Sequence, residues 1–429
     1  MLNRCLLLGT PVLTLALAAC AWQSVTPPAG QNVAASSVES RPEHGRRYNV
    51  IYEFPGGAGG QTPIGGLAFI HGVMFGATYS GGDVSGCDCG TVFAATKVIY
   101  SFKGVAGKDG ATPIGTVLAI GNKLYGETFA GGRDDGVCTN HYPLPGCGTV
   151  YEVDAGGKER VIYRFKGGSD GESPAGGLVS LNGTLYGVTE AGGVSTSCGL
   201  SSAPSGCGVI FALDSSGHEK VIYRFKGPPD GAVPLKALFP FEGKLYGTTF
   251  YGGGCTYTNG CGTVFWVTTS GKESVLYSFK GGDDGQYPNA SLIALNGSLW
   301  GTTIQGGCVK SCQYGTFGTI FKMSTSGDET IVHRFTDLPD GAFPQGSLAV
   351  LNHTIYGTTS SGGTRRRAGG TIYSATSSGV QIVHSFGAAP NGDGPGLQGL
   401  TLDESPKALY GLTIDGGAHG AGTIFRYTP

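Results

Sequence analysis

The sequence predicts an all-β fold: a seven-bladed β-propeller closed by its N-terminal strand. An aromatic residue followed by glycine recurs seven times, about 56 residues apart. Each repeat holds four short runs of β-branched and aromatic residues separated by turns, which is typical of a propeller blade. The seven pairs are Phe75-Gly76, Tyr125-Gly126, Tyr186-Gly187, Tyr246-Gly247, Trp300-Gly301, Tyr356-Gly357 and Tyr410-Gly411.

The third repeat shows the four expected strands in order. Strand A is predicted at 177–181, and Asn182-Gly183 is a strong signal for the hairpin turn that follows. Strands B, C and D are predicted at 185–189, 209–213 and 221–225. We expect the glycine of strand B to allow close approach of neighbouring backbones near the axis.

The two ends of the chain predict a closed ring. Residues 47–54, RYNVIYEF, match strand D, but no strand A, B or C precedes them. The chain finishes at GTIFRYTP, which matches strand C. The first strand can therefore complete the seventh blade and leave no unpaired edge. A β-solenoid is the alternative, although its rungs are usually much shorter than this repeat. The propeller domain is predicted to span 47–429.

The N-terminus has the features of an export signal. Residues 1–19 contain Arg4 and a short apolar stretch, and Leu17-Ala18-Ala19-Cys20 resembles the lipobox of bacterial lipoproteins. The resemblance implies cleavage before Cys20 and attachment of lipid to it, with an ordinary signal peptide as the alternative. Residues 20–46 would form a flexible tether. The expected location is extracytoplasmic. Ala21, the residue after the cysteine, favours attachment to the outer membrane if the source has one.

Three phrases carry a wider resemblance: LYGTT at 245–249, CGTVF at 261–265, and YSFKG-x-x-DG-x-x-P at 277–288. Their repetition over 47–429 is similar to the GloVer-type tandem repeat proteins of bacterial envelopes. The resemblance implies an envelope location and this fold. It supplies no catalytic residues.

Ten cysteines outside the N-terminal segment fall in five local pairs, each between strands B and C of one repeat. In an exported chain such pairs predict disulfides. Metal sites are the alternative, but no other ligand recurs beside them, so neither a metal nor a cofactor is expected. The pairs are Cys87/Cys89, Cys138/Cys147, Cys198/Cys207, Cys255/Cys261 and Cys308/Cys312.

Most other candidate groups are interpreted as scaffold. His333 and His384 occupy the tyrosine position of strand D. Glu127 and Glu190 are the glutamates of strand B that a glycosidase could use, although a solvated surface role is favoured. An Asp-Gly turn recurs between repeats, where cation ligation is the alternative. Its aspartates are Asp109, Asp170, Asp230, Asp284, Asp340 and Asp393.

Strand order predicts which face binds ligands. Successive strands reverse direction, so the D–A and B–C connections emerge on the same side, and here they are the long ones. Binding residues gather on such loops, and aromatic and arginine side chains dominate binding energies. The candidates are Arg133, His141, Tyr142, Tyr251, Tyr257 and Arg366.

The predicted function is a lipid-anchored binding or scaffold module, since no acid, base or metal set stands out from the repeat. The formal net charge of −2 does not favour nucleic acid as a partner. The expected partners are the membrane, through the lipid, and an envelope protein or extracellular glycan, with the ring itself monomeric. The alternative is a glycan-active hydrolase or lyase that uses the loop-rich face.

Overall fold

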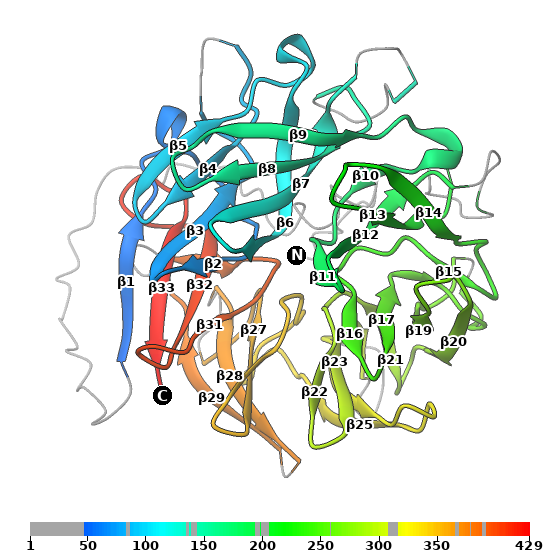
Figure 1. Ribbon diagram of the computed structural model, residues 1–429. Coiled ribbons are helices and arrows are strands. Elements are labelled where there is room, and N and C mark those ends of the chain that lie inside the picture. Colours follow the sequence, from blue (N-terminus) through cyan, green and yellow to red (C-terminus); the bar gives the residue numbers. More distant parts are fainter. Residues whose placement is uncertain are drawn as a thin grey trace, which may run out of the picture.

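The computed structural model describes residues 47–82, 86–133, 137–138, 144–193, 198, 206–257, 259–307, 316–364, 369–377, 379–387 and 392–429. These residues form seven antiparallel blades around a central axis (Figure 1), which confirms the predicted β-propeller. The helices of this described part are 3-10 turns at Gly57–Gly59, Val105–Gly107 and Gly168–Asp170. None of its helices has the length and hydropathy needed to cross a bilayer. The predicted signal segment, Cys20 and the tether lie outside the described residues.

Each blade follows the order A to D from the axis outward, with strand A in two pieces in several blades. Blade 1 contains β2 (Ala68–Ile70), β3 (Val73–Thr78), β4 (Thr91–Ala94) and β5 (Lys97–Ser101). Blade 2 contains β6 (Gly110–Ile120), β7 (Lys123–Gly131), β8 (Thr149–Asp154) and β9 (Glu159–Arg164). Blade 3 contains β10 (Glu172–Pro174), β11 (Val179–Leu181), β12 (Thr184–Ala191), β13 (Val209–Leu213) and β14 (Glu219–Arg224). Blade 4 contains β15 (Gly231–Ala232), β16 (Phe239–Phe241), β17 (Lys244–Thr249), β18 (Tyr251–Gly252), β19 (Thr263–Val267) and β20 (Glu273–Ser278).

The last three blades repeat this plan. Blade 5 contains β21 (Gly285–Pro288), β22 (Ile293–Leu295), β23 (Ser298–Gly306), β24 (Thr319–Met323) and β25 (Glu329–Arg334). Blade 6 contains β26 (Ala349–Leu351), β27 (Thr354–Thr359), β28 (Thr371–Thr376) and β29 (Gly379–Ser385). Blade 7 contains β30 (Asp393–Pro395), β31 (Thr401–Asp403), β32 (Ala408–Asp415) and β33 (Thr423–Thr428), and its outer strand is β1 (Arg47–Glu53).

The ring closes through β1, as the sequence predicts. β1 pairs antiparallel with β33, with Tyr48 opposite Tyr427, and Figure 1 shows the first and last strands side by side. The Tyr48 ring also stacks on His384 of blade 6, with ring centroids 3.8 Å apart. The backbone N–H of Ala418 donates to Glu53 at 2.6 Å. The N-terminal strand therefore joins blade 7 by hydrogen bonds and blade 6 by ring contact.

Strand A bends toward the axis in the middle. In blade 3, both β10 and β11 pair with β12, and residues 175–178 lie between them. At these bends neighbouring blades meet, because Thr116 forms parallel bridges with both Gly66 and Gly177. The bends thus bring the middle of every strand A to one axis, where side chains from distant repeats can converge.

The glycine of strand B has a different role from the one expected. Gly247 lies opposite Phe265 of strand C, and a Cβ added at Gly247 would come within 2.5 Å of the Phe265 ring. Gly187 and Phe211 repeat this arrangement. The glycine therefore makes room for an aromatic side chain of its own blade, and the predicted approach of neighbouring backbones is wrong.

Five of the six Asp-Gly turns, at Asp109, Asp170, Asp230, Asp284 and Asp340, connect neighbouring blades, in agreement with their interpretation as scaffold. In blades 3 and 4, the Tyr223 hydroxyl donates to Asp230 at 2.8 Å, and Asp230 also accepts from the backbone N–H of Gly231 at 2.7 Å. The same hydroxyl contacts Glu273 at the start of the next strand D. Burial, and then the charge of Asp230, raises the pKa of Glu273 to about 7. Equivalent glutamates with the same pKa occur at Glu159, Glu219 and Glu329.

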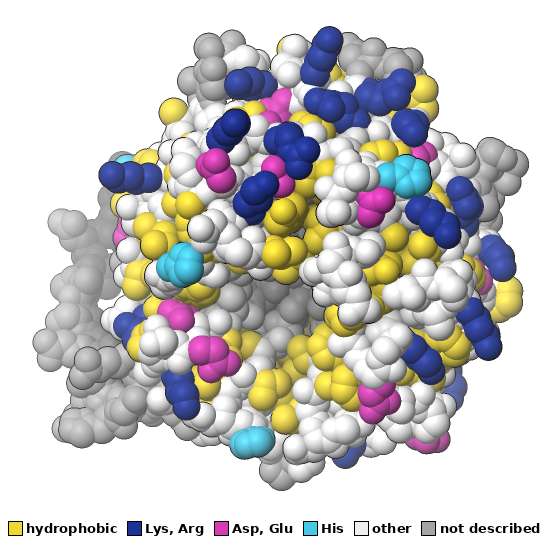
Figure 2. All heavy atoms as spheres, viewed as in Figure 1, with side chains coloured by type: hydrophobic (Ala, Val, Ile, Leu, Met, Phe, Trp, Pro, Cys, Tyr) yellow, Lys and Arg dark blue, Asp and Glu magenta, His cyan; other side chains and the backbone are white. Residues whose placement is uncertain are grey.

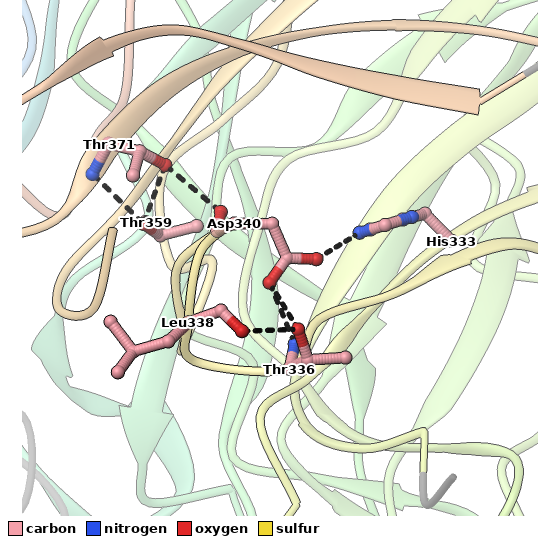
Figure 3. Close-up of polar contacts among 6 residues, drawn as sticks. All are labelled: His333, Thr336, Leu338, Asp340, Thr359 and Thr371. Atoms are coloured by element: carbon pink, nitrogen blue, oxygen red, sulfur yellow. Dashed lines mark hydrogen bonds and ion pairs between the residues drawn. The ribbon is translucent and has the colours of Figure 1, made fainter. Parts of the chain in front are cut away.

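Histidine replaces tyrosine in the fifth of these junctions, as the sequence predicts (Figure 3). The Nε2 atom of His333 lies 2.8 Å from Oδ2 of Asp340, and Thr336 donates to Oδ1 from its backbone N–H and its hydroxyl. Burial opposes ionisation, but these hydrogen bonds hold the pKa of Asp340 below its usual value. The backbone carbonyl of Asp340 also accepts from Thr371 at 3.4 Å, which ties the turn to strand C.

We predict that Gly247→Ala destabilises the propeller by about 1–3 kcal/mol, because the added methyl group would overlap the Phe265 ring. The measurement is the free energy of unfolding from urea titration. Gly254→Ala is the matched control, since a Cβ there meets no heavy atom within 4 Å. Equal stabilities of the two variants would contradict the assigned role of the strand-B glycine.

Stability should fall as pH rises from 5 to 7. The glutamates of the junctions have folded pKa values of about 7, above the unfolded value, so their contribution is complete below about pH 4.5 and is lost as pH passes 7. We expect the melting temperature to drop by roughly 2–4 °C over this range. In Glu273→Gln the drop should be smaller, because the group facing Asp230, Tyr223 and Lys226 no longer titrates. The exposed Glu404→Gln should keep the full drop, and an identical drop in both variants would refute the assignment.

Candidate functional site

The B–C loops on the predicted ligand-binding face carry disulfides, each within a single loop. Four of the five expected pairs are bonded: Cys87–Cys89, Cys138–Cys147, Cys198–Cys207 and Cys255–Cys261. Cys308 and Cys312 lie outside the described residues. A Cβ added at Gly167, in the turn before strand A, would lie 2.8 Å from the Cys138 sulfur. The B–C loop and the D–A turn of a blade therefore meet on one side of the ring. Because disulfides persist in oxidising compartments, the four bridges indicate an extracytoplasmic location.

Of the six predicted loop residues, the structure describes Arg133 of blade 2 and Tyr251 and Tyr257 of blade 4. Arg133 and Tyr257 are exposed, on loops of blades 2 and 4. Tyr251 is buried, and its ring packs against Phe250 with ring centroids 4.9 Å apart, so it is part of the packed interior of blade 4. His141, Tyr142 and Arg366 lie outside the described residues. All six residues stay candidates, and among the described ones Arg133 is on a different blade from Tyr251 and Tyr257.

A set of side chains does converge on the axis, at the bend of strand A. The residue after the proline of strand A is called the axial position here. This position contributes Ile64, Ile114, Ala175 and the partly buried Leu235 to one apolar cluster. In blade 7 the axial position is Gly396, and the next residue, Leu397, belongs to the same cluster. Five of the seven blades thus fill this level of the axis with hydrocarbon. Figure 2 shows one face of the ring, hollowed at its centre and bordered by hydrophobic side chains.

The axial positions of blades 5 and 6 are polar instead. Asn289 and Gln345 are only 4% and 7% exposed. The Nε2 atom of Gln345 donates to Ser360 at 3.0 Å, but its Oε1 has no hydrogen-bond partner, and neither has Oδ1 of Asn289. Leaving a buried acceptor unpaired costs about 1–3 kcal/mol. Two such acceptors where other blades carry aliphatic groups make this level of the axis a candidate binding site.

A third unpaired acceptor comes from strand B. The rim position, defined as the residue after the last threonine of strand B, is 6% exposed in blade 3, where it is Glu190. The Oε2 atom of Glu190 is buried without a partner. Other blades place uncharged groups at the rim position: Tyr79, Phe129, Phe250, Ile304, Ser360 and Ile414. Phe129, Tyr79 and Ile414 belong to the apolar cluster, which places the rim position beside the axis.

The surroundings of Glu190 are acidic and aromatic. Glu172 of β10 is also buried, and its Oε2 lies 2.9 Å from the Cys138 sulfur. Burial, and next the charge of Glu172, raises the pKa of Glu190 to about 7, and burial raises the pKa of Glu172 to about 7. Burial first, and then the charge of Glu190, raises the pKa of Tyr79. Tyr79 of blade 1 and Glu190 of blade 3 therefore approach each other across the rim.

One buried cation also reaches the axis. Lys236 follows the axial position of blade 4 and is 4% exposed. Its Nζ donates to the backbone carbonyl of Leu397 in blade 7 at 2.7 Å, across the ring. Burial lowers its pKa to about 7. Among the described residues, no acidic side chain forms an ion pair with it.

Glu127 is the second strand-B glutamate and lies opposite the axial Ile114. Its Oε1, like Oε2 of Glu190, is buried without a partner. Its Oε2 accepts from the backbone N–H of Gly177 at 2.7 Å, which links blades 2 and 3. Burial raises its pKa to about 8 in spite of this bond. Both glutamates are buried, so the solvated role that the sequence favoured for them is wrong.

The three sulfur and carboxyl groups of Cys138, Cys147 and Glu172 lie within 4.8 Å of one another. Because the two sulfurs are bonded to each other, neither is a thiolate that could bind a metal ion. This group is therefore a carboxyl beside a disulfide.

Reasoning from loops missed Asn289, Gln345, Glu172 and Lys236. A signal was present in the repeat itself. Lys236 stands where blades 1, 2, 3 and 6 have glycine, and Asn289 and Gln345 stand where blades 1, 2 and 4 have isoleucine or leucine. Polar departures from an apolar repeat position would have pointed to the axis.

Several solved structures are distantly similar to this chain. They include the gluconolactonase XC5397 from Xanthomonas campestris, at 14% identity and a TM-score of 0.38, covering 71% of this chain and 81% of that one. The Trypanosoma rangeli sialidase has 11% identity and a TM-score of 0.43, covering 90% of this chain and 60% of that one. TM-scores below 0.5 carry no argument about activity.

Among curated proteins, none matches the chain. A family model does match, over residues 94–314 and again over 198–425, and it describes the Gloeobacter/Verrucomicrobia repeat. The two matches together cover most of the propeller and agree with the recurring phrases and the seven blades. The chain therefore belongs to the Gloeobacter/Verrucomicrobia repeat family.

Proposed function

We propose that this propeller is a binding module that takes a small sugar, or the end of a glycan, at its axis. The observation that carries the proposal is the set of three buried oxygens without partners, on Glu190, Asn289 and Gln345. All three accept hydrogen bonds, so they favour a ligand rich in donors, such as the hydroxyl groups of a sugar. The rings of Tyr79 and Phe129 add apolar surface on which a sugar face can lie.

A glycan-active hydrolase or lyase is the second candidate function. The pairing of Glu190 with Glu172 supports it, because two neighbouring carboxyls with raised pKa values can share acid and base roles. Lys236, whose pKa is about 7, could assist in proton transfer near neutral pH. Binding remains the better supported function, since it requires only the unpaired acceptors. Product formation from a bound glycan, lost in Glu172→Gln, would favour the enzyme.

Replacing the axial amides by leucine should remove binding without loss of stability. Asn289→Leu and Gln345→Leu introduce the kind of side chain that blade 4 has in Leu235, and each removes a buried unpaired oxygen. We expect sugar affinity to fall about tenfold or more and the melting temperature to stay equal or rise. Ligand-observed NMR across a sugar panel, beside thermal unfolding, measures both.

Glu273→Gln is the control for this experiment, because Glu273 is a partly buried glutamate on the outer strand of blade 4, away from the axis. It should retain affinity. If the leucine variants stay folded and bind like the wild type, the axis is not the binding site.

We also propose that the module is anchored to the envelope through lipid on Cys20. The lipobox-like Leu17-Ala18-Ala19-Cys20 supports this anchor. Mass spectrometry of the mature N-terminus should find a lipid-modified cysteine, and Cys20→Ser should release the protein from membranes. A mature chain that begins elsewhere, without lipid, would contradict the anchor.

A further inference from the structure

Two buried glutamates at the rim, Glu190 and Glu172, have no basic partner in the part of the chain that the structure describes. Glu172 lies opposite Ala191, the residue that follows Glu190 in strand B, and its charge adds to burial in raising the pKa of Glu190. Both side chains are more than nine-tenths buried, and Oε2 of Glu190 is without a partner. Buried carboxylates are normally paired with a cation. Because burial raises the pKa of both carboxyls, they favour the neutral form in the free protein, and a positive group bound beside them would favour the carboxylate form.

Lys236 does not supply that positive charge. Its Nζ is held by the Leu397 carbonyl at 2.7 Å, and burial alone accounts for its altered pKa. Lys236 is the one buried lysine among the described residues, and it does not neutralise the Glu190 carboxyl. Tyr79 and Phe129 are the aromatic residues at the rim position of blades 1 and 2, and the pKa of Tyr79 is raised by burial and then by the charge of Glu190.

Aromatic rings beside a carboxylate are a favourable setting for an organic ammonium group. The face of an aromatic ring attracts a cation, and the carboxylate accepts its N–H donors. The amide oxygens of Asn289 and Gln345 provide further acceptors on the axis. An inorganic divalent cation would gain nothing from the rings and prefers a larger set of oxygen ligands.

We propose that the axial ligand carries a protonated amine, as an amino sugar does, and that Glu190 binds this amine beside Tyr79. The inference rests on the proposed function and names the class of its ligand. Glu172 keeps the site negative, and the acceptors of blades 5 and 6 bind the hydroxyl groups. A neutral sugar of the same shape would fill the axis but leave the Glu190 charge uncompensated.

Calorimetric titration of the full chain in detergent micelles with glucosamine and with glucose tests the proposal, since the two probes differ only at the amine. We expect glucosamine to bind at least tenfold more tightly than glucose. In Glu190→Gln, which keeps the side-chain shape, this preference should fall to about twofold or less. Glu273→Gln, which alters a partly buried glutamate on the outer strand of blade 4, should keep the full preference.

Three results would overturn the inference. Equal affinities for the two sugars, both reduced by Gln345→Leu, would show that the axis binds sugars but does not select the amine. Heat released by calcium chloride alone, lost in Glu190→Gln, would show that the site binds an inorganic cation. Absence of binding by either sugar, with no effect of Glu190→Gln or Gln345→Leu on any ligand of the panel, would refute the proposed function as well.

Discussion

The pairing of β1 with β33 is the contact on which the rest of the structure depends. A set of blades that did not close would form an open arc with two bare strand edges. Closure instead brings the bend of every strand A to a single axis. Ile64 and Leu397, which come from opposite parts of the sequence, share one apolar cluster for this reason. The axial site therefore exists only in the closed ring, and no single blade contains it.

The fold could be predicted from the sequence because its signals are local and repeated. Turn pairs such as Asn182-Gly183 and the complementary ends at 47–54 and 423–428 set the strand order and the closure. The role of the strand-B glycine could not be predicted, because the contact with Phe265 depends on which residue of strand C lies opposite Gly247. Cross-strand register is fixed by pairing in space, which a single repeat does not display.

The candidate site was less predictable, since side chains on the axis are far apart in sequence. The B–C loops were the predicted site because their sequences vary most, but the structure buries Tyr251 and leaves Tyr257 exposed. Glu190 and Lys236 sit in the most regular parts of their repeats, at positions that other blades fill with uncharged residues. Within a tandem repeat, the other copies are an internal reference for the scaffold. A charged departure that is also buried is then a sign of function, because burial of an unpaired charge is costly.

The resemblance of β1 to every strand D has a consequence for how the chain folds. Any strand C could accept β1, but in blades 1 to 6 a tight turn joins strand C to its own strand D, and such local hairpins form before distant strands meet. The chain is thereby protected from closing too early into a smaller ring. β33 becomes the acceptor for β1 only after the other blades have formed. A nascent or truncated chain that lacks β33 presents β1 and the edge of β32 to other molecules, which makes aggregation the main hazard of its incomplete forms.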